Sequence, residues 1–184
     1  MFTHSRRLLL TASAAIAVFA LPVAARAQLE TIRVTDSQVK ADKFDAEARS
    51  YEVNDWSQLR KAARLRELAA ELRTAEDPLG TVSLYWAARD RYYSDDPKAA
   101  RPLMEGAGDR AIAIGDVFNA ATAYTEAAYI CADIKDYDRM RTLATKARLL
   151  SNSPMLTDSQ RFQLRTRLAL SGAPVGVVAM IAEP

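Results

Sequence analysis

Histidine and cysteine are almost absent from this sequence of 184 residues, which holds one of each, His4 and Cys131. His4 falls in an N-terminal stretch that has the features of an export signal, so we expect the processed protein to contain no imidazole. Without imidazole, neither a Ser-His-Asp or Cys-His nucleophile system nor a His-ligated zinc site can form. A single cysteine also excludes an intrachain disulfide. Because Cys131 stands in an apolar stripe, we expect a small buried side chain there rather than a reactive thiol.

Sequence motifs for nucleotide or metal binding are lacking as well. The chain contains no G-x-G-x-x-G, no P-loop and no Cys-x-x-Cys pair. The adjacent acids Asp95 and Asp96 stand before Pro97, where a helix cap and a turn explain them better than an acid/base pair does. We therefore predict that the protein is not an enzyme and has no catalytic, cofactor-binding or metal-ligating residues.

An excess of positive charge is lacking once the export signal is set aside. Residues 1–27 contain three of the 25 basic residues and no acid, so 22 basic and 23 acidic residues remain, with a net charge of −1. Affinity for nucleic acid comes largely from neutralising phosphates. The remaining chain, residues 28–184, is long enough for one domain with a sizeable core, and its charge predicts no nucleic-acid partner.

Residues 1–27 have the three parts of a secretory signal peptide. These are the pair Arg6-Arg7, an apolar run from Leu8 to Leu21, and the small residues Ala25-Arg26-Ala27 before a cleavage site. The start of the run also resembles a twin-arginine signal, so the general secretory (Sec) route and the twin-arginine route both stay open. The run is too short and too rich in alanine for a membrane span, although an uncleaved anchor is the alternative. The sequence predicts an exported protein of the periplasm or cell envelope, without a stable membrane anchor after cleavage.

Residues 55–172 show helical periodicity divided into units of about twenty residues. Each unit begins with an aspartate that can cap a helix, followed by small or apolar residues at spacings of three and four. The predicted helix starts are Asp55, Asp77, Asp95, Asp116, Asp136 and Asp158. Short connections make successive helices antiparallel. We therefore predict an all-α fold of about six helices, stacked as antiparallel hairpins in a solenoid or a compact bundle.

Small residues recur at one place in most of these units, where we expect the backbones of neighbouring helices to approach closely. Eleven positions after the start of each unit lie Ala88, Gly106, Ala127, Ala147 and Ala169. In the first unit this place is taken by Arg66, which predicts an end helix with an exposed face.

The two flanking segments are less regular. Residues 28–54 are rich in charge and alanine, but Phe44, Tyr51 and Val53 form no continuous stripe. We therefore expect a mobile leader or arm there. Residues 173–184 are apolar, and because exposed apolar runs are a liability, we expect this C-terminal tail to lie over the last helix.

One stretch, residues 98–152, carries a recognisable set of positions. They are the turn Gly115-Asp116, then Ala120, Tyr124 and Ala127, and before the turn the pair Ala107-Gly108. This pattern resembles the tetratricopeptide repeat family of helical hairpins. The repeat is degenerate, since Met104 stands where the family has Trp and Ala132 where it has Pro. The resemblance implies a scaffold for protein–protein contacts, usually made through a concave surface.

Aromatic and arginine side chains gather in the second predicted helix, and Tyr, Trp and Arg dominate the hot spots of protein interfaces. Tyr85, Arg89 and Tyr92 share one side of this helix, and Tyr93 follows them. We take these four residues as candidates for partner binding. Trp86 is expected to be a core residue.

These observations predict an exported, non-catalytic interaction module that binds a protein or peptide between its helices. Two alternatives stay open. A carboxylate-dependent hydrolase acting on an envelope polymer would need two acids that face one deep pocket with raised pKa values. A small-ligand-binding protein would need an enclosed apolar cavity between the second and fourth helices.

Overall fold

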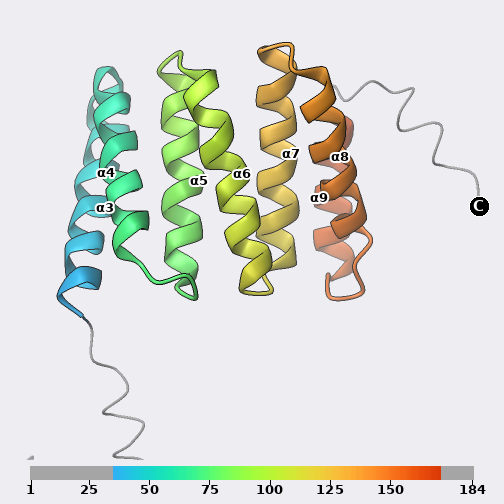
Figure 1. Ribbon diagram of the computed structural model, residues 1–184, viewed down its shortest axis with the longest axis horizontal. Helices are drawn as coiled ribbons and strands as arrows, with labels where there is room; N and C mark the ends of the chain where they lie inside the picture. Colours follow the sequence, from blue (N-terminus) through green and yellow to red (C-terminus); the bar gives the residue numbers. More distant parts are fainter. Residues whose placement is uncertain (1–34, 171–184) are drawn as a thin grey trace, which may run out of the picture. The chain divides into compact units, whose positions relative to one another are not determined.

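Most of the aspartates that mark predicted helix starts begin helices in the computed structural model, which describes residues 35–170 (Figure 1). Every element in this range is helical. The elements are α3 (Asp36–Asn54), the 3-10 turn η1 (Trp56–Gln58), α4 (Leu59–Leu72), α5 (Pro78–Tyr93), α6 (Pro97–Ala113), α7 (Val117–Asp133), α8 (Tyr137–Ser151) and α9 (Asp158–Leu170). The predicted all-α fold of stacked helices is confirmed for the described residues, with seven α-helices there instead of about six. The predicted export signal, residues 1–27, and the tail, residues 173–184, lie outside the described range.

Three turns of one design link the helices from α5 to α8. In each turn a residue with positive φ precedes an aspartate, and the pairs are Asp95-Asp96 (φ 62° at the first residue), Gly115-Asp116 (78°) and Lys135-Asp136 (61°). The aspartate amide donates to a carbonyl five residues earlier, which closes the preceding helix. The aspartate carboxylate then accepts from an amide of the following helix and caps it. The positive-φ residue and the aspartate of each turn thus end one helix and start the next, so neighbouring helices run antiparallel.

Asp55 caps the 3-10 turn η1 rather than α4, which begins at Leu59. Two further predicted helix starts move by one residue. Asp96 rather than Asp95 caps α6, and its carboxylate accepts from the backbone amide three residues later at 3.2 Å. At the start of α9, Thr157 rather than Asp158 is the cap. The Thr157 hydroxyl accepts from the Gln160 amide, and the Gln160 side chain accepts from the Thr157 amide, which forms a capping box.

Each helix packs mainly against its neighbours in the chain, so that α3 to α8 form a row and α9 lies against α7 and α8. Ala88, Ala127 and Ala147 are fully buried at the helix contacts, as the small-residue pattern predicts. Ala169 is exposed instead, because none of the described helices covers that side of α9. The small side chains let the helix backbones approach one another closely.

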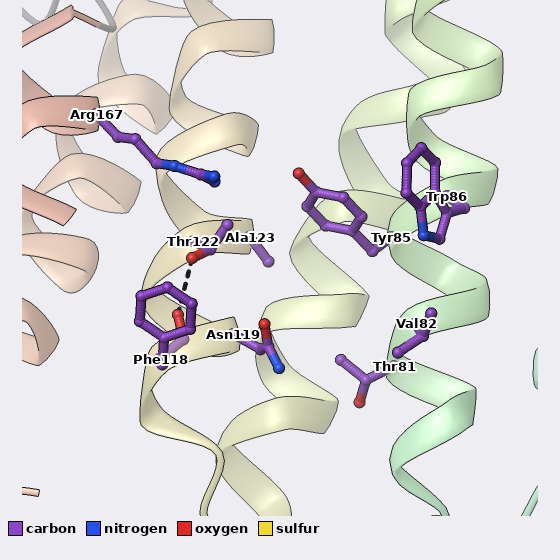
Figure 2. Close-up of a pocket in the computed structure, with 9 residues that line it drawn as sticks. All are labelled: Thr81, Val82, Tyr85, Trp86, Phe118, Asn119, Thr122, Ala123 and Arg167. Carbon is purple, nitrogen blue, oxygen red and sulfur yellow. Dashed lines mark hydrogen bonds between the residues drawn. The ribbon is translucent and has the colours of Figure 1, made fainter. Parts of the chain in front are cut away.

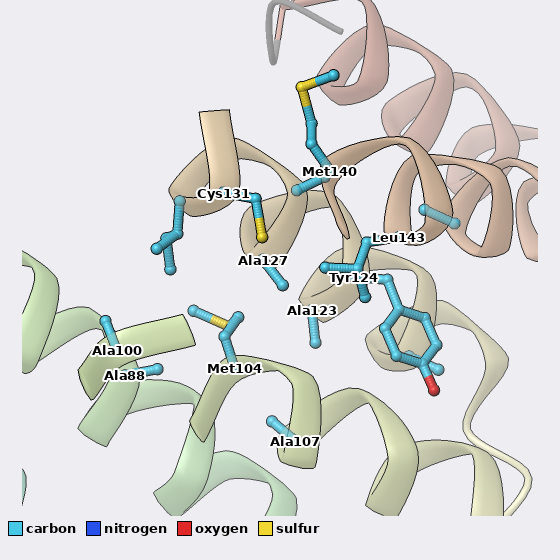
Figure 3. Packing of buried hydrophobic residues seen from close by; sticks show 14 of the residues in the cluster. Ala88, Ala100, Met104, Ala107, Ala123, Tyr124, Ala127, Cys131, Met140 and Leu143 are labelled. Atoms are coloured by element: carbon cyan, nitrogen blue, oxygen red, sulfur yellow. The ribbon is translucent and has the colours of Figure 1, made fainter. Parts of the chain in front are cut away.

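The main core lies where α5, α6, α7 and α8 meet (Figure 3). Its largest fully buried side chains include Met104, Leu143 and Cys131, set among alanines. In α7, ten of the 17 residues are buried, so this helix lies at the centre of the core. Because α7 is held on several sides, the side chains on its one open face are carried by a firmly packed helix.

The structure contradicts the predicted leader over the range Asp36–Asn54, which forms α3 and packs along α4. The hydrophobic pattern gives little sign of this helix, because it buries only Ala41 and Ala48. Its contact with the rest of the row includes several ion pairs, made with Arg66 and Arg73 of α4 and its C-cap. The helical unit therefore begins at Asp36 and not at Asp55.

Arg66 of α4, which faces α3, also differs from the sequence prediction. The sequence predicts an exposed face at this position of α4, yet Arg66 is only 3% exposed. Its guanidinium Nε donates to Glu52 of α3 at 2.5 Å. An arginine in the place of a small residue thus marks the contact with a helix that carries acids. Within residues 35–170, no helix is long and apolar enough to cross a membrane.

Two glycines of α6 test how closely the helices approach. A Cβ on Gly108 would lie 2.6 Å from Cε1 of the buried Tyr124, whereas a Cβ on Gly106 would meet only Leu84, at 3.9 Å. Overpacking of this kind costs about 1–3 kcal/mol. We expect Gly108→Ala to lower the free energy of unfolding by that amount, as measured by urea denaturation.

Gly106→Ala is the matched control on the same helix. It replaces glycine by a better helix former without a clash, so it should raise stability by about 0.5–1 kcal/mol. Equal stability of the two variants would show that α6 and α7 are less closely packed than described.

A candidate binding groove

A groove of about 240 Å³ lies between α5 and α7, with one wall completed by α9 (Figure 2). It is partly open to solvent. The residues that line it are Thr81, Val82, Tyr85 and Trp86 from α5, Phe118, Asn119, Thr122 and Ala123 from α7, and Arg167 from α9. Three of these nine side chains are aromatic. The groove thus offers apolar and aromatic surface on alternate helices of the row, with a cation at its edge.

Trp86 belongs to this groove and not to the core, which corrects the prediction from sequence. Its side chain remains 36% exposed. The Tyr85 ring meets it edge to face, with ring centroids 5.9 Å apart and an interplanar angle of 90°. Behind Trp86, the buried guanidinium of Arg66 lies 5.7 Å from the ring centroid. Trp86 is therefore held in place on one side and open to a ligand on the other.

Arg89 lies one helical turn further along α5, among three aromatic rings. Its guanidinium carbon is 4.9 Å from the Trp86 centroid, 5.4 Å from that of Tyr93 and 6.0 Å from that of Tyr85. It also donates a hydrogen bond to the Tyr93 hydroxyl at 3.0 Å. Within the described part of the chain it forms no ion pair with a carboxylate. Cation–π contacts hold the charge in position but do not neutralise it.

Aromatic side chains continue from the groove toward the carboxyl ends of α5 and α7. Tyr92 packs edge-on against Tyr129 of α7, with centroids 5.9 Å apart, and its hydroxyl is hydrogen-bonded to Asp133. Tyr93 in turn lies 6.3 Å from Trp56, which is 68% exposed. Burial and the hydrogen bond to Asp133 raise the pKa of Tyr92, so it stays a neutral donor.

The structure brings all four predicted residues, Tyr85, Arg89, Tyr92 and Tyr93, onto one connected aromatic surface of α5. Sequence reasoning missed the other residues of this surface. Trp86 belongs to α5 itself, and the rest come from other elements: Trp56, Phe118, Tyr129 and Arg167. A partial indication existed, because Phe118 and Tyr129 are large aromatic residues in a helix whose buried positions are mostly alanine.

Acidic residues do not line the groove among the residues described. The acid nearest to Arg167 is Glu126 of α7, with N and O atoms 3.9 Å apart. In residues 35–170 no cluster of His, Cys, Asp and Glu side chains is arranged to hold a metal ion. The groove is therefore suited to holding a side chain by packing and charge.

No protein-family model, curated protein or solved structure matches this chain. The resemblance to tetratricopeptide repeats thus remains an expectation drawn from the residues.

Cys131 gives a direct test of the packing of the main core. It is 0% exposed, and burial together with the neighbouring Asp136 raises the pKa of its thiol to about 11. Only the thiolate reacts with disulfide reagents, so a raised pKa and lack of access both slow the reaction. At pH 8 we expect the folded protein to react with 5,5′-dithiobis(2-nitrobenzoate) at least a hundredfold more slowly than the same protein in 6 M guanidinium chloride, where a pKa near 8.5 returns. A folded rate within tenfold of the denatured rate would contradict the burial of this side chain.

Proposed function

We propose that the protein is an exported, non-catalytic module that binds a segment of a partner protein in the groove between α5, α7 and α9. The partner segment supplies an apolar or aromatic side chain to the groove and a carboxylate to Arg89. The observation that carries this proposal is the position of Arg89, held by three aromatic rings beside an open apolar groove.

The composition of this surface supports recognition of a protein. Trp, Tyr and Arg are the residues that most often dominate binding energy at protein interfaces. Here they are anchored: Trp86 lies against Arg66, Tyr92 is bonded to Asp133, and Arg89 is bonded to Tyr93. Side chains that are already ordered lose little conformational entropy on binding, which favours affinity.

The size of the groove also supports recognition of a protein segment. Its volume of about 240 Å³ is below the roughly 300–1,000 Å³ that small-molecule sites usually have. It is also open, whereas a small-ligand carrier would need an enclosed cavity. A groove of this kind holds one or two side chains of a longer segment that continues along the aromatic surface toward Tyr93 and Tyr129.

The charge of the site supports a partner that carries an acid. Arg89 forms no ion pair with a carboxylate among the described residues, and it lies beside low-polarity rings, where an added ion pair is stronger than in water. The alternative of a hydrolase has less support, because it needs two acids facing one pocket and the described lining of this groove contains none.

Export is part of the proposal and comes from the sequence. Residues 1–27 have the form of a secretory signal, so the partner belongs to the periplasm or cell envelope.

A displayed library of random twelve-residue peptides tests the function. Peptides retained by the purified wild-type protein should share an aromatic or large apolar residue with an acid close to it. Arg89→Met keeps the length of the side chain and removes its charge. We expect it to weaken binding of the selected peptides at least tenfold in isothermal titration calorimetry, which is about 1.4 kcal/mol.

Arg141→Met is the matched control, because Arg141 is an exposed arginine on α8 whose ion pair, among the described residues, is with its neighbour Asp138. It should change the affinity by less than twofold, and neither variant should shift the midpoint of thermal unfolding by more than a few degrees. Selected peptides that bind the Arg89 variant as tightly as the wild type would contradict the proposed site.

A further inference from the structure

A second concentration of charge lies behind the groove, at the contact of α3 with α4 and α5. Arg73, at the end of α4, donates to Asp42 and Asp45 of α3 at 2.8 and 2.7 Å, and to Asp77 at 3.3 Å. Its side chain is almost fully buried. One end of α3 is thus held by a guanidinium whose donors are shared among three carboxylates.

Arg66 holds the other end of α3. Its Nε donates to Glu52 at 2.5 Å, and another of its nitrogens lies 3.5 Å from Asp45. The same Nε lies 3.7 Å from Oδ2 of Asp90, which belongs to α5. Arg66 therefore stands between an acid of α3 and an acid of α5.

The charges in this contact do not balance. Five carboxylates, those of Asp42, Asp45, Glu52, Asp77 and Asp90, share the two guanidiniums of Arg66 and Arg73. Only Asp42 among these acids has a mostly exposed side chain. An uncompensated buried charge is costly, and a buried carboxyl group commonly takes up a proton instead.

Asp90 is the group at which a proton relieves the imbalance. It is 3% exposed, and its Oδ2 has no hydrogen-bond partner. Burial and the charge of Glu52 raise the pKa of Asp90 to about 8, against the lowering effect of Arg66. When protonated, Asp90 can donate a hydrogen bond to Glu52, which also favours the proton.

The groups that face Asp90 come from each helix around it. Glu52 faces it from α3, Arg66 from α4 and Arg89 from its own helix, α5. On α6, which also packs on α5, Arg110 donates to carbonyls at the end of α4. The α6 pair Arg101 and Glu105 is bonded toward α8, through Asp136 and Arg139. Glu52 and Asp45 of α3 are thus the acids that share Arg66 with Asp90, and Glu52 and Asp90 both lie at its Nε.

We propose that α3 is a pH-sensitive latch, docked on α4 and α5 while Asp90 carries a proton and released when Asp90 and Glu52 are both charged. Release follows from two anions facing each other with one guanidinium between them. Few apolar contacts oppose it, since Ala41 and Ala48 are the only residues that α3 buries among those described.

The latch also acts on the groove. Arg66 holds the inner side of Trp86, at 5.7 Å, and Arg89 lies on the same ring at 4.9 Å. A change in the bonding of Arg66 therefore reaches the aromatic wall directly. This effect on ligand binding rests on the proposed function, whereas the docking of α3 does not.

The direction of the pH dependence follows from linkage. The docked form holds a proton that the released form, with Asp90 in water near its usual pKa, gives up. Docking therefore weakens as the pH rises, by up to tenfold per pH unit for one proton, in the interval between the two pKa values. Above about pH 8, where the docked form is ionised too, the dependence levels off.

Hydrogen exchange of the α3 amides in the purified protein tests the proposal. Protection factors are taken relative to an unstructured peptide at the same pH, so that intrinsic exchange rates cancel. Between pH 5.5 and 8.5 we expect the protection of α3 in the wild type to fall at least thirtyfold, while that of α7 changes by less than threefold.

Asp90→Asn imitates the protonated form, because its amide can donate to Glu52 at every pH. It should abolish the dependence and keep α3 protected at pH 8.5. Glu52→Gln removes the other charge and should flatten the profile as well, which covers the case that the first variant folds poorly. Asp138→Asn, the same change at an exposed site of α8, should keep the wild-type profile. A flat wild-type profile, or a full dependence in either Asp90→Asn or Glu52→Gln, would overturn the latch.

Trp86 fluorescence separates the latch from its effect on the groove. In a Trp56→Phe background Trp86 is the only tryptophan, and its emission should change with the same pH midpoint as the protection of α3. No ligand is needed, so failure of the proposed peptide binding leaves this result intact. A pH-dependent α3 with constant Trp86 emission would overturn the link to the groove and retain the latch.

Discussion

The three-residue turn with a positive φ and an aspartate is the constraint on which the row of helices depends. Its backbone hydrogen bonds close one helix, its carboxylate caps the next, and no residue is left over to let the helices diverge. Because the turn recurs after α5, α6 and α7, these helices and α8 are antiparallel neighbours with contacts along their length. The small side chains at those contacts matter only because the turns bring the backbones together.

The groove is a consequence of this alternation. In an antiparallel row every second helix points the same way, so α5 and α7 present corresponding turns to the same side, and α6, which packs against both, lies nearer the viewer in Figure 1. Val82 of α5 and Phe118 of α7 line opposite sides of the groove (Figure 2), and Tyr92 and Tyr129 pack against each other toward the carboxyl ends of the two helices. Alanines occupy the faces that α5 and α7 turn toward their packed neighbours, so the large aromatic side chains remain for the open face.

The extent to which sequence predicts this structure depends on whether an interaction is local. Caps and turns involve residues a few positions apart, so the starts of α5 to α9 are predicted to within one residue, and the error at Asp95 arises because two adjacent aspartates compete for one cap. The aspartate predicted to start α4, Asp55, caps the 3-10 turn η1 instead, and α4 begins at Leu59. Helix α3 was missed because its stability comes from ion pairs with Arg66 and Arg73, which are distant in sequence and carry no periodic signature. Trp86 was misplaced for the same reason, since the face of α5 that is covered is decided by α6 and not by the side chains of α5 alone.

Apolar packing and ion pairs hold different parts of the molecule together with different strengths of contact. Between α5 and α8 the helices are joined by apolar burial, which is independent of pH and varies little with salt. Between α3 and the rest of the row, the helices are held by ion pairs. The free energy lost when these charges leave water is nearly as large as the free energy gained when they pair. Arg66 joins the two regions, because its guanidinium is bonded to the ionic contact on one side and lies against Trp86 on the other. A helix held in this way is free to respond to its surroundings without disturbing the core that supports the groove.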